Sequence, residues 1–315
     1  RKCPYCDFNS HTASPELPEQ AYVDALLADL DQDLHAVYGR ELSSIFFGGG
    51  TPSLMAPETV AALIEDATHF FDPLPDIEIT LEANPDDLTR EKLTELSATP
   101  INRLSIGTQS FFDDELLFMN RAHSSSEAVA SIHNAKAAGF DNLSIDLIYG
   151  MPEMSHEKWL QNIQTALSYN IPHISSYALT VEPKTALHQF IQKGVIAPLD
   201  DGLAQEHFHL LVDTLEEHGF IHYELSNFGK EGYFSKNNSS YWLGKKYLGI
   251  GPSAHSYDGE KRGWNIANNS LYLKSLANNE LPIEIETLTK TDRYNEYIMT
   301  GLRTIWGVSL DRIEN

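Results

Sequence analysis

The only two cysteines of this 315-residue chain lie together near its beginning, in Arg1-Lys2-Cys3-Pro4-Tyr5-Cys6. A Cys-x-x-Cys pair suits thiol–disulfide exchange, zinc binding or an iron–sulfur cluster. Disulfide exchange needs only these two sulfurs. Structural zinc needs four ligands, and a cluster with one open iron needs a third cysteine. The residues that accompany the pair therefore decide its chemistry.

Composition excludes several classes of protein. The net charge of −23 argues against a nucleic-acid or anionic-membrane partner, because either would demand a basic surface. No apolar run approaches the roughly 18 residues of a membrane span. Two cysteines rule out a disulfide framework and suit a reducing compartment. We therefore expect a cytoplasmic protein without a transmembrane segment.

Strand-like and helix-like segments alternate along most of the chain. The β-like runs cover 44–47, 77–81, 103–106, 143–148 and 174–179, and the helical patterns cover 19–38, 57–71, 89–98, 124–138 and 157–169. Ser124 with Glu127 predicts a capping box, and Gly139 predicts the end of that helix. Short connections between strand and helix predict parallel βα units. Since no strand precedes the first helix, we expect another strand upstream of Arg1 and a partial (β/α)6 barrel.

The ends of the predicted strands carry a repeated kind of residue. They run into Gly48-Gly49-Gly50-Thr51-Pro52-Ser53, Glu82-Ala83-Asn84-Pro85, Gly107-Thr108-Gln109-Ser110-Phe111, Asp146-Leu147-Ile148-Tyr149-Gly150-Met151-Pro152 and Tyr177-Ala178-Leu179. In βα barrels the working residues lie at these C-terminal strand ends. The pattern therefore predicts one ligand site lined by glycines, carboxylates and a carboxamide.

Each of these residues also has an ordinary structural explanation. The three glycines form either a nest for an anionic group or a tight strand-to-helix turn. Glu82 alone could be a solvated loop carboxylate, and Gln109 and Asp146 carry the same alternative. Arg121 could bridge a ligand carboxylate bidentately or lie at the surface. The prediction of a site depends on the whole set.

This ordered set, with Cys3 and Cys6 at its start, resembles the radical S-adenosylmethionine (SAM) enzymes. More narrowly, it resembles the oxygen-independent coproporphyrinogen III oxidase family, from Arg1 to at least Tyr257. The resemblance implies a partial (β/α)6 radical-SAM barrel with a [4Fe–4S] cluster held by Cys-x-x-x-Cys-x-x-Cys. SAM would bind at the open iron, where reduction cleaves it to a 5′-deoxyadenosyl radical.

Carried over residue by residue, the resemblance makes Cys3 and Cys6 the second and third cluster ligands. The first would lie upstream of Arg1, so we expect that the polypeptide as written does not hold a stable three-cysteine cluster. The implied SAM-binding residues are Tyr5, Gly49, Gly50, Thr51, Glu82, Gln109, Arg121, Asp146, Ala178 and His255. No catalytic residue is assigned.

Two branches of the family differ at named positions. The decarboxylating oxidase carries a fourth cysteine where this chain has Phe8, so the chain is more similar to the haem chaperone-type branch. That branch has a His-Asn-x-x-Tyr-Trp motif associated with haem. Here Asn238, Tyr241 and Trp242 are kept but Asn237 replaces the histidine, and a carboxamide is a poor haem ligand.

Other interpretations remain open at this point. Cys-Pro-Tyr-Cys also occurs in glutaredoxin-like dithiol proteins, and zinc would need ligands beyond nearby His11. A non-catalytic barrel that binds SAM or a nucleotide-like ligand is a third reading. If the chain is an enzyme, the resemblance implies an oxidoreductase similar to coproporphyrinogen dehydrogenase.

The resulting hypothesis is a radical SAM protein of haem and porphyrin metabolism, either a haem chaperone-type protein or a genuine coproporphyrinogen III oxidase. Its partners would be a tetrapyrrole or haem, an electron donor and a haem-acceptor protein. We expect a barrel over 1–225, a barrel-edge extension over 226–269, and a truncated, mainly helical C-terminal domain over 270–315. Within the later part, 220–225 and 247–250 predict strands, and 270–277 and 291–305 predict helices.

Overall fold

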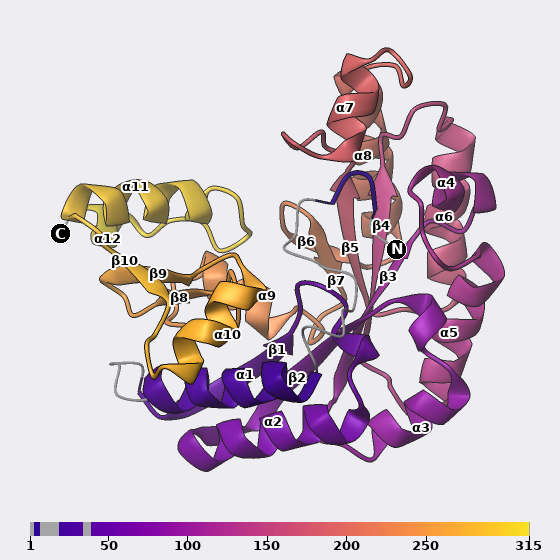
Figure 1. The fold of residues 1–315 in the computed structure, drawn as a ribbon. Helices are drawn as coiled ribbons and strands as arrows, with labels where there is room; N and C mark the ends of the chain where they lie inside the picture. Colours follow the sequence, from indigo (N-terminus) through magenta and orange to yellow (C-terminus); the bar gives the residue numbers. More distant parts are fainter. Residues whose placement is uncertain (1–2, 7–18, 34–38, 315) are drawn as a thin grey trace. The chain divides into compact units, whose positions relative to one another are not determined.

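The structure is a computed structural model that describes residues 3–6, 19–33 and 39–314 (Figure 1). Its main sheet has seven strands in the order β1-β2-β3-β4-β5-β7-β6. Their bounds are Glu41–Phe47 for β1, Asp72–Ala83 for β2, Arg103–Gln109 for β3, Leu143–Tyr149 for β4, His173–Ala178 for β5, Ile221–Glu224 for β6 and Asn227–Gly229 for β7. Neighbours from β2 to β5 pair in parallel, whereas β7 runs antiparallel to β5 and β6.

Helices connect the parallel strands, as parallel pairing requires. The connecting helices are α2 (Pro57–Phe70), α3 (Arg90–Ser97), α5 (Ser125–Ala137) and α6 (His156–Ser168), with the short α4 (Asp113–Phe118) between β3 and α5. In Figure 1, α3, α5 and α6 lie along one side of β3 and β4. Every residue of β3 is buried, including the polar side chains of Arg103, Ser105, Thr108 and Gln109, as expected for a strand inside a parallel sheet covered on its faces. The predicted parallel α/β architecture is confirmed.

The predicted helix signals act as expected at α5. Ser124 accepts from the Glu127 N–H at 3.3 Å, and the Glu127 carboxylate accepts from the Ser124 N–H at 2.7 Å. Gly139 follows the helix with φ of +94°, the left-handed conformation that a C-cap glycine adopts. Both ends of α5 are therefore determined locally.

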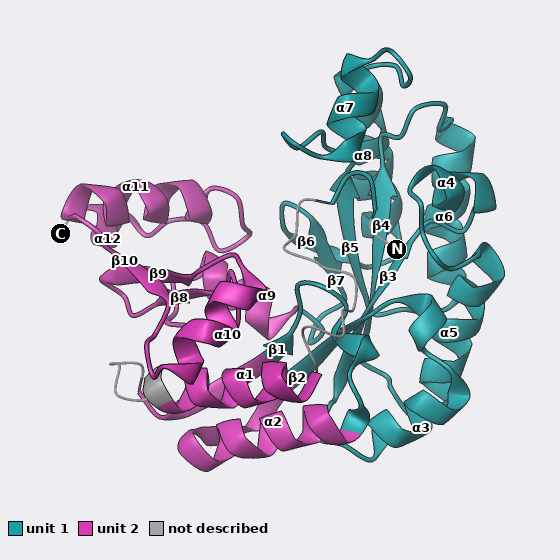
Figure 2. Ribbon diagram, viewed as in Figure 1, with its two compact units in different colours: residues 1–10, 46–57, 79–234 teal, residues 11–45, 58–78, 235–315 magenta. Residues whose placement is uncertain are grey.

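The chain divides into two compact units (Figure 2). Unit 1 consists of residues 1–10, 46–57 and 79–234, and unit 2 of residues 11–45, 58–78 and 235–315. Unit 1 also contains α7 (Ala186–Gln192), α8 (Asp201–Glu217) and two 3-10 helices, Pro52–Leu54 and Pro85–Asp87. It holds the C-terminal ends of β1 to β5, where the predicted site lies.

Unit 2 contains a second, antiparallel sheet in the order β10-β9-β8. These strands are β8 (His255–Tyr257), β9 (Lys261–Asn265) and β10 (Ile283–Thr287), and the helices are α1 (Glu19–Asp33), α9 (Lys236–Trp242), α10 (Asn269–Ala277), α11 (Lys290–Gly301) and α12 (Leu310–Glu314). Ala25 of α1 packs with Tyr272 and Leu276 of α10 in a small apolar core.

Two of the predicted elements are wrong in part. Residues 247–250 form no strand, only a single bridge from Tyr247 to Tyr257. Gly249 lies so close to the backbone that a Cβ there would be 2.1 Å from the His255 carbonyl oxygen, and Gly251 has φ of +106°. The helix predicted over 291–305 ends at Gly301, where an added Cβ would be 2.6 Å from the Gly307 carbonyl oxygen.

One predicted helix end and the predicted domain boundaries are not tested by the structure. The predicted extension of the first helix over 34–38 lies outside the described residues, and the expected boundaries at 225 and 269 stay predictions. Among the described helices, none combines the length and the apolar character needed to cross a membrane.

Candidate functional site

The two cysteines lie in a short turn that is tied to the rest of unit 1. The Cys6 N–H donates to the Cys3 carbonyl at 3.3 Å, and the Leu187 N–H of α7 donates to the Pro4 carbonyl at 2.8 Å. Among the described residues the two cysteines form no disulfide, and both are half-buried. The two sulfurs therefore lie on one turn whose backbone is anchored to α7.

The glycine run and the second strand end contact each other directly. The Gly49 N–H donates to Glu82 Oε2 at 3.0 Å, and Gly49 has φ of +105°, a conformation that favours glycine. An added Cβ on Gly48 would be 3.1 Å from the Glu82 carboxyl carbon, whereas Gly50 has open space beside it. The glycines thus bring the backbone against Glu82 and leave a gap on their other side.

Arg121 links the cysteine turn to two strand ends. Its Nη2 donates to Asn84 Oδ1 at 2.6 Å and to the Gly107 carbonyl at 2.8 Å, while Nη1 lies 3.6 Å from Cys3 Sγ. Tyr5 also hydrogen-bonds to Arg121, and burial raises the pKa of this phenol, with Cys3 adding to the rise. In the described part of the chain, Arg121 Nε is buried without a hydrogen-bond partner. The Arg121 guanidinium therefore joins the cysteine turn to the ends of β2 and β3. Its Nε–H is the donor that a ligand could still use.

Gln109 reaches the same place through an unusual backbone. Its φ is +64°, and the register between β3 and β4 shifts between Ile106 and Gln109. Such a conformation costs about 1–3 kcal/mol in a non-glycine residue and is found mainly at functional sites. An added Cβ on Gly107 would be 3.0 Å from Gln109 Nε2 and 3.2 Å from Arg121 Nη2. The bulge thus turns the carboxamide toward the guanidinium.

Two carboxylates lie within electrostatic reach of one another. Burial, with Glu82 adding to it, raises the pKa of Asp146 to about 7, and Ser105 Oγ donates to Asp146 Oδ1 at 3.5 Å. Burial also raises the pKa of Glu82, and the hydrogen bond from Gly49 opposes this. Two buried acidic groups together favour a cationic ligand or hydroxyl donors.

The structure brings most of the predicted site residues of unit 1 together. Cys3, Tyr5, Arg121, Gln109, Gly49, Glu82 and Asp146 form one continuous set of contacts and charge interactions. Thr51 joins it through Asn84, whose Nδ2 donates to Thr51 Oγ1 at 3.4 Å. Ala178 lies at the end of β5, paired with Tyr149 of β4. His255 belongs to unit 2, so its assignment to the same pocket stays a prediction.

Sequence reasoning missed Asn84 and Tyr177. Asn84 bridges Thr51 and Arg121, and the signal for it was its spacing of two residues from Glu82, because alternate residues of an extended chain share a face. Burial raises the pKa of Tyr177, with Asp146 adding to it, although 44% of its side chain is exposed. The signal for Tyr177 was its place in the predicted strand end Tyr177-Ala178-Leu179.

The haem-motif residues lie in unit 2, on α9. The Asn238 N–H donates to Ser235 Oγ at 3.2 Å, which caps the helix, and the Asn237 N–H donates to Glu78 Oε1 at 3.2 Å. The Asn237 side chain hydrogen-bonds to Tyr241, which is 48% exposed, and Trp242 is half-buried. Phe8, which distinguishes the two branches of the family, and His11, the nearby candidate zinc ligand, lie outside the described residues.

The residues present fit a cluster and SAM in part. Cys3 and Cys6 offer two sulfur ligands, and no group of three or more His, Cys, Asp or Glu side chains in the described residues is arranged around a metal position. The unpaired Arg121 Nε suits a carboxylate, and the acidic pair suits an ammonium or ribose hydroxyls. The donor set thus matches a zwitterionic sulfonium ligand.

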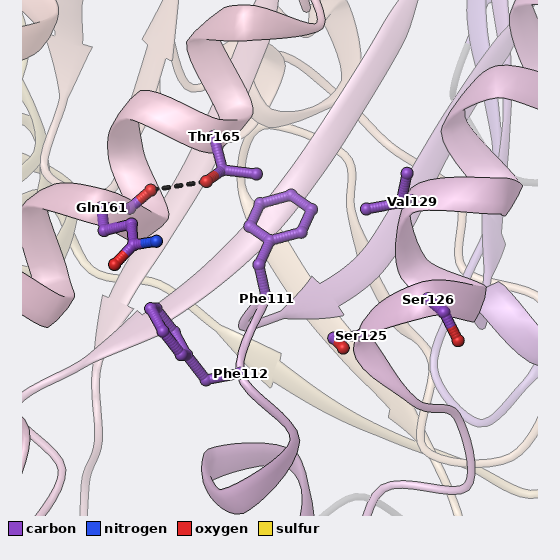
Figure 3. Close-up of a pocket in the computed structure, with 7 residues that line it drawn as sticks. All are labelled: Phe111, Phe112, Ser125, Ser126, Val129, Gln161 and Thr165. Atoms are coloured by element: carbon purple, nitrogen blue, oxygen red, sulfur yellow. Dashed lines mark hydrogen bonds between the residues drawn. The ribbon is translucent and has the colours of Figure 1, made fainter.

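A surface pocket of about 330 Å³ lies elsewhere in unit 1 (Figure 3). It is lined by Phe111, Phe112, Ser125, Ser126, Val129, Gln161 and Thr165, and the Thr165 hydroxyl donates to the Gln161 carbonyl at 2.7 Å. No titratable side chain lines it. We assign the chemistry to the strand ends.

The chain is similar to several known proteins. The Radical SAM superfamily matches residues 1–166. The chain is 35% identical over 312 residues to the haem chaperone HemW of Bacillus subtilis, covering 98% of this chain and 82% of that protein. It is 36% identical over 325 residues to HemW of Haemophilus influenzae, covering 100% and 82%.

Among solved structures, the Escherichia coli coproporphyrinogen III oxidase HemN, a radical SAM enzyme, matches with a TM-score of 0.82. The match has 22% identity and covers 100% of this chain and 75% of that one. At this identity the likeness concerns the fold. It confirms the predicted partial barrel.

Proposed function

Because this chain belongs to the radical SAM superfamily and to the family of the haem chaperone HemW, we propose that it handles haem and binds SAM beside an iron–sulfur cluster. The superfamily implies the cluster and SAM as cofactors. The resemblance inferred from the cysteine pair and the strand ends is confirmed. Haem as cargo, a haem-acceptor protein and an electron donor are the finer parts of the proposal.

The observation that carries the SAM site is the guanidinium of Arg121. It contacts Cys3 Sγ at 3.6 Å and Asn84 Oδ1 at 2.6 Å, so one side chain spans the cysteine turn and the polar end of β2. A cofactor that touches both an iron and the strand ends would have to bind where these elements meet. The contacts of Arg121 thus bring motifs that are far apart in the sequence together in space.

We assign the following roles to the residues of unit 1. Cys3 and Cys6 would hold two irons of the cluster, which when bound supplies the electron for reductive cleavage of SAM. Arg121 would hold the SAM carboxylate, and the gap beside Gly50 would admit the methionyl end. Glu82 and Asp146 would accept hydrogen bonds from the ammonium and ribose groups, and Gln109 would donate to the same ligand.

A haem chaperone and a coproporphyrinogen III oxidase predict different results in a turnover assay and a haem titration. Full-length protein with the third cluster cysteine that the resemblance implies is reconstituted anaerobically with iron and sulfide. It is then incubated with coproporphyrinogen III, SAM and a low-potential reductant. We expect no protoporphyrinogen, and stable binding of ferric haem in a separate titration. Formation of protoporphyrinogen would overturn the chaperone assignment, and failure to bind haem would overturn haem as cargo.

A further inference from the structure

In the small sheet of unit 2, strands β8 and β9 have one buried face and one more open face. Ser256 of β8 and Gly263 and Asn265 of β9 are buried, and Asn265 Nδ2 donates to Asp29 Oδ2 at 3.0 Å. Side chains alternate along a strand, so His255 and Tyr257 share the opposite face of β8. His255 is exposed and pairs across the strands with Trp264, which is half-buried.

Aromatic rings continue this open face toward α9. The rings of His255 and Trp264 lie 6.3 Å apart, those of Tyr257 and Tyr247 lie 6.0 Å apart, and those of Tyr247 and Tyr241 lie 4.6 Å apart. We call these five residues the aromatic face. All five are at least partly exposed. A row of accessible rings suits a broad, flat, aromatic ligand, because stacked and edge-on ring contacts add to the gain from apolar burial.

The aromatic face contains one strong ligand for iron. Within the described part of the chain, the His255 imidazole takes part in no hydrogen bond, so its ring nitrogens remain open to a ligand. Imidazole nitrogen is a good axial ligand for haem iron, whereas the carboxamide of Asn237 is a poor one. We propose that His255 is an axial ligand of the haem iron and that the aromatic face receives the porphyrin, in place of the SAM-binding role that the resemblance implied for this histidine. This inference rests on haem as cargo.

The backbone around His255 is held firmly enough to present a ligand. The Gly249 N–H donates to Ser256 Oγ at 3.0 Å, and the Asn265 N–H donates to the Ala254 carbonyl at 2.9 Å. The Gly251 N–H donates to Asp29 Oδ2 at 2.9 Å. Residues on both sides of His255 are therefore fixed to buried groups, while its own ring faces solvent.

Tyr241 is the competing oxygen ligand on the same face. Its phenol already hydrogen-bonds to the Asn237 side chain, and burial raises the pKa of Tyr241, which opposes formation of a phenolate. Arg262, which pairs with Tyr257 across the strands, donates through Nη2 to Glu296 at 2.8 Å. These contacts favour His255 over Tyr241 as the ligand.

The test is a titration of the full chain with ferric haem, followed by the Soret and visible bands before and after reduction. In the His255→Ala variant we expect haem affinity to fall by about tenfold or more. Loss of a residue that only supports a metal ligand already lowers metal affinity by about 10–100-fold. The imidazole-type bands should disappear and return on addition of free imidazole. His69→Ala is the matched control, since His69 is also an exposed imidazole beside an aromatic ring in unit 2. It should leave affinity and spectrum unchanged.

Each other outcome has a definite meaning. An unchanged spectrum in His255→Ala would overturn the assignment, as would loss of the ligand bands in Tyr241→Phe alone. Wild-type protein that binds no haem would overturn haem as cargo together with this inference. Circular dichroism of each variant confirms that the fold is retained, which is expected because His255 is exposed.

Discussion

Two acidic side chains share a desolvated position at the ends of β2 and β4. Burial raises the pKa of both Glu82 and Asp146. Repulsion from Glu82 adds to the rise at Asp146, whereas Arg103 and Arg121 oppose it. A pair of this kind disfavours its own ionisation until a cation or hydroxyl donors arrive. SAM brings a sulfonium, an ammonium and ribose hydroxyls. The residues thus favour the loaded site over the empty one.

Asp146 should make the stability of the ligand-free protein depend on pH. Its pKa is about 7 in the folded chain and about 3.9 when unfolded, so the folded state holds more protons between these values. Stability therefore falls as pH rises from about 4 to about 7. We expect Asp146→Asn to lose this part of the decline, measured by urea unfolding across that window. Asp213→Asn, an exposed carboxylate in unit 1, should keep the wild-type slope, and an equal slope in Asp146→Asn would contradict the burial of this charge.

Glu82 should matter for SAM and not for the cluster. A hydrogen bond to a charged group contributes about 1.5–3 kcal/mol, so Glu82→Ala should weaken SAM binding by about tenfold to a hundredfold. Equilibrium dialysis on the reconstituted protein measures the affinity, and the cluster absorbance should stay at the wild-type level. Glu95→Ala, an exposed glutamate of α3, is the control. Unchanged SAM affinity in Glu82→Ala would remove this residue from the site.

At the scale of elements, the parallel strands of unit 1 could be predicted because each is a short apolar run between clear turn signals. Leu143–Tyr149, for example, lies between a helix-ending glycine and Gly150. The same regularity places polar residues at strand ends, so most residues of the proposed SAM site could be inferred. The contacts of Asn84 and the backbone of Gln109 could not, because they depend on how β1, β2 and β3 meet.

The small sheet of unit 2 could not be predicted from the sequence. Its strands have three to five residues, and β10 is almost entirely exposed, so it shows no apolar alternation. Its position depends on Asp29, a buried carboxylate on α1 that lies more than 200 residues away along the chain. Long-range polar contacts of this kind leave no local pattern.

Asp29 should be the main polar anchor of unit 2. Its Oδ2 accepts from Gly251 N–H at 2.9 Å, Asn265 Nδ2 at 3.0 Å and Tyr272 Oη at 2.5 Å. An amide in its place loses the charge and turns a donor toward donors, so Asp29→Asn should destabilise the fold by about 1–3 kcal/mol. Urea unfolding measures the change. Asp24→Asn, exposed on the same helix, should stay within about 0.5 kcal/mol. Equal stability of the two variants would show that Asp29 is not the main polar anchor of unit 2.

At the scale of the whole molecule, the net charge of −23 sets which partners approach readily. A strongly negative surface attracts cations from solution and repels anions, with rate effects of about 10-fold to 1000-fold at low salt. The proposed electron donor must reach the cluster through this field. A donor with a positive docking surface is therefore favoured.

A matched pair of small reductants tests this effect. In the reconstituted protein, reduced methyl viologen, a cation, should reduce the cluster about tenfold faster than its sulfonated, negatively charged analogue at low ionic strength. The advantage should shrink as salt is raised, because the screening length falls to about 3 Å at 1 M. Stopped-flow bleaching of the cluster absorbance gives both rates.

A preference that does not change with salt would mean that the chemistry of the two donors, and not the field of the protein, sets their rates. A faster anionic donor at low salt would show that the path to the cluster is locally positive, and the donor would then be expected to dock through acidic residues.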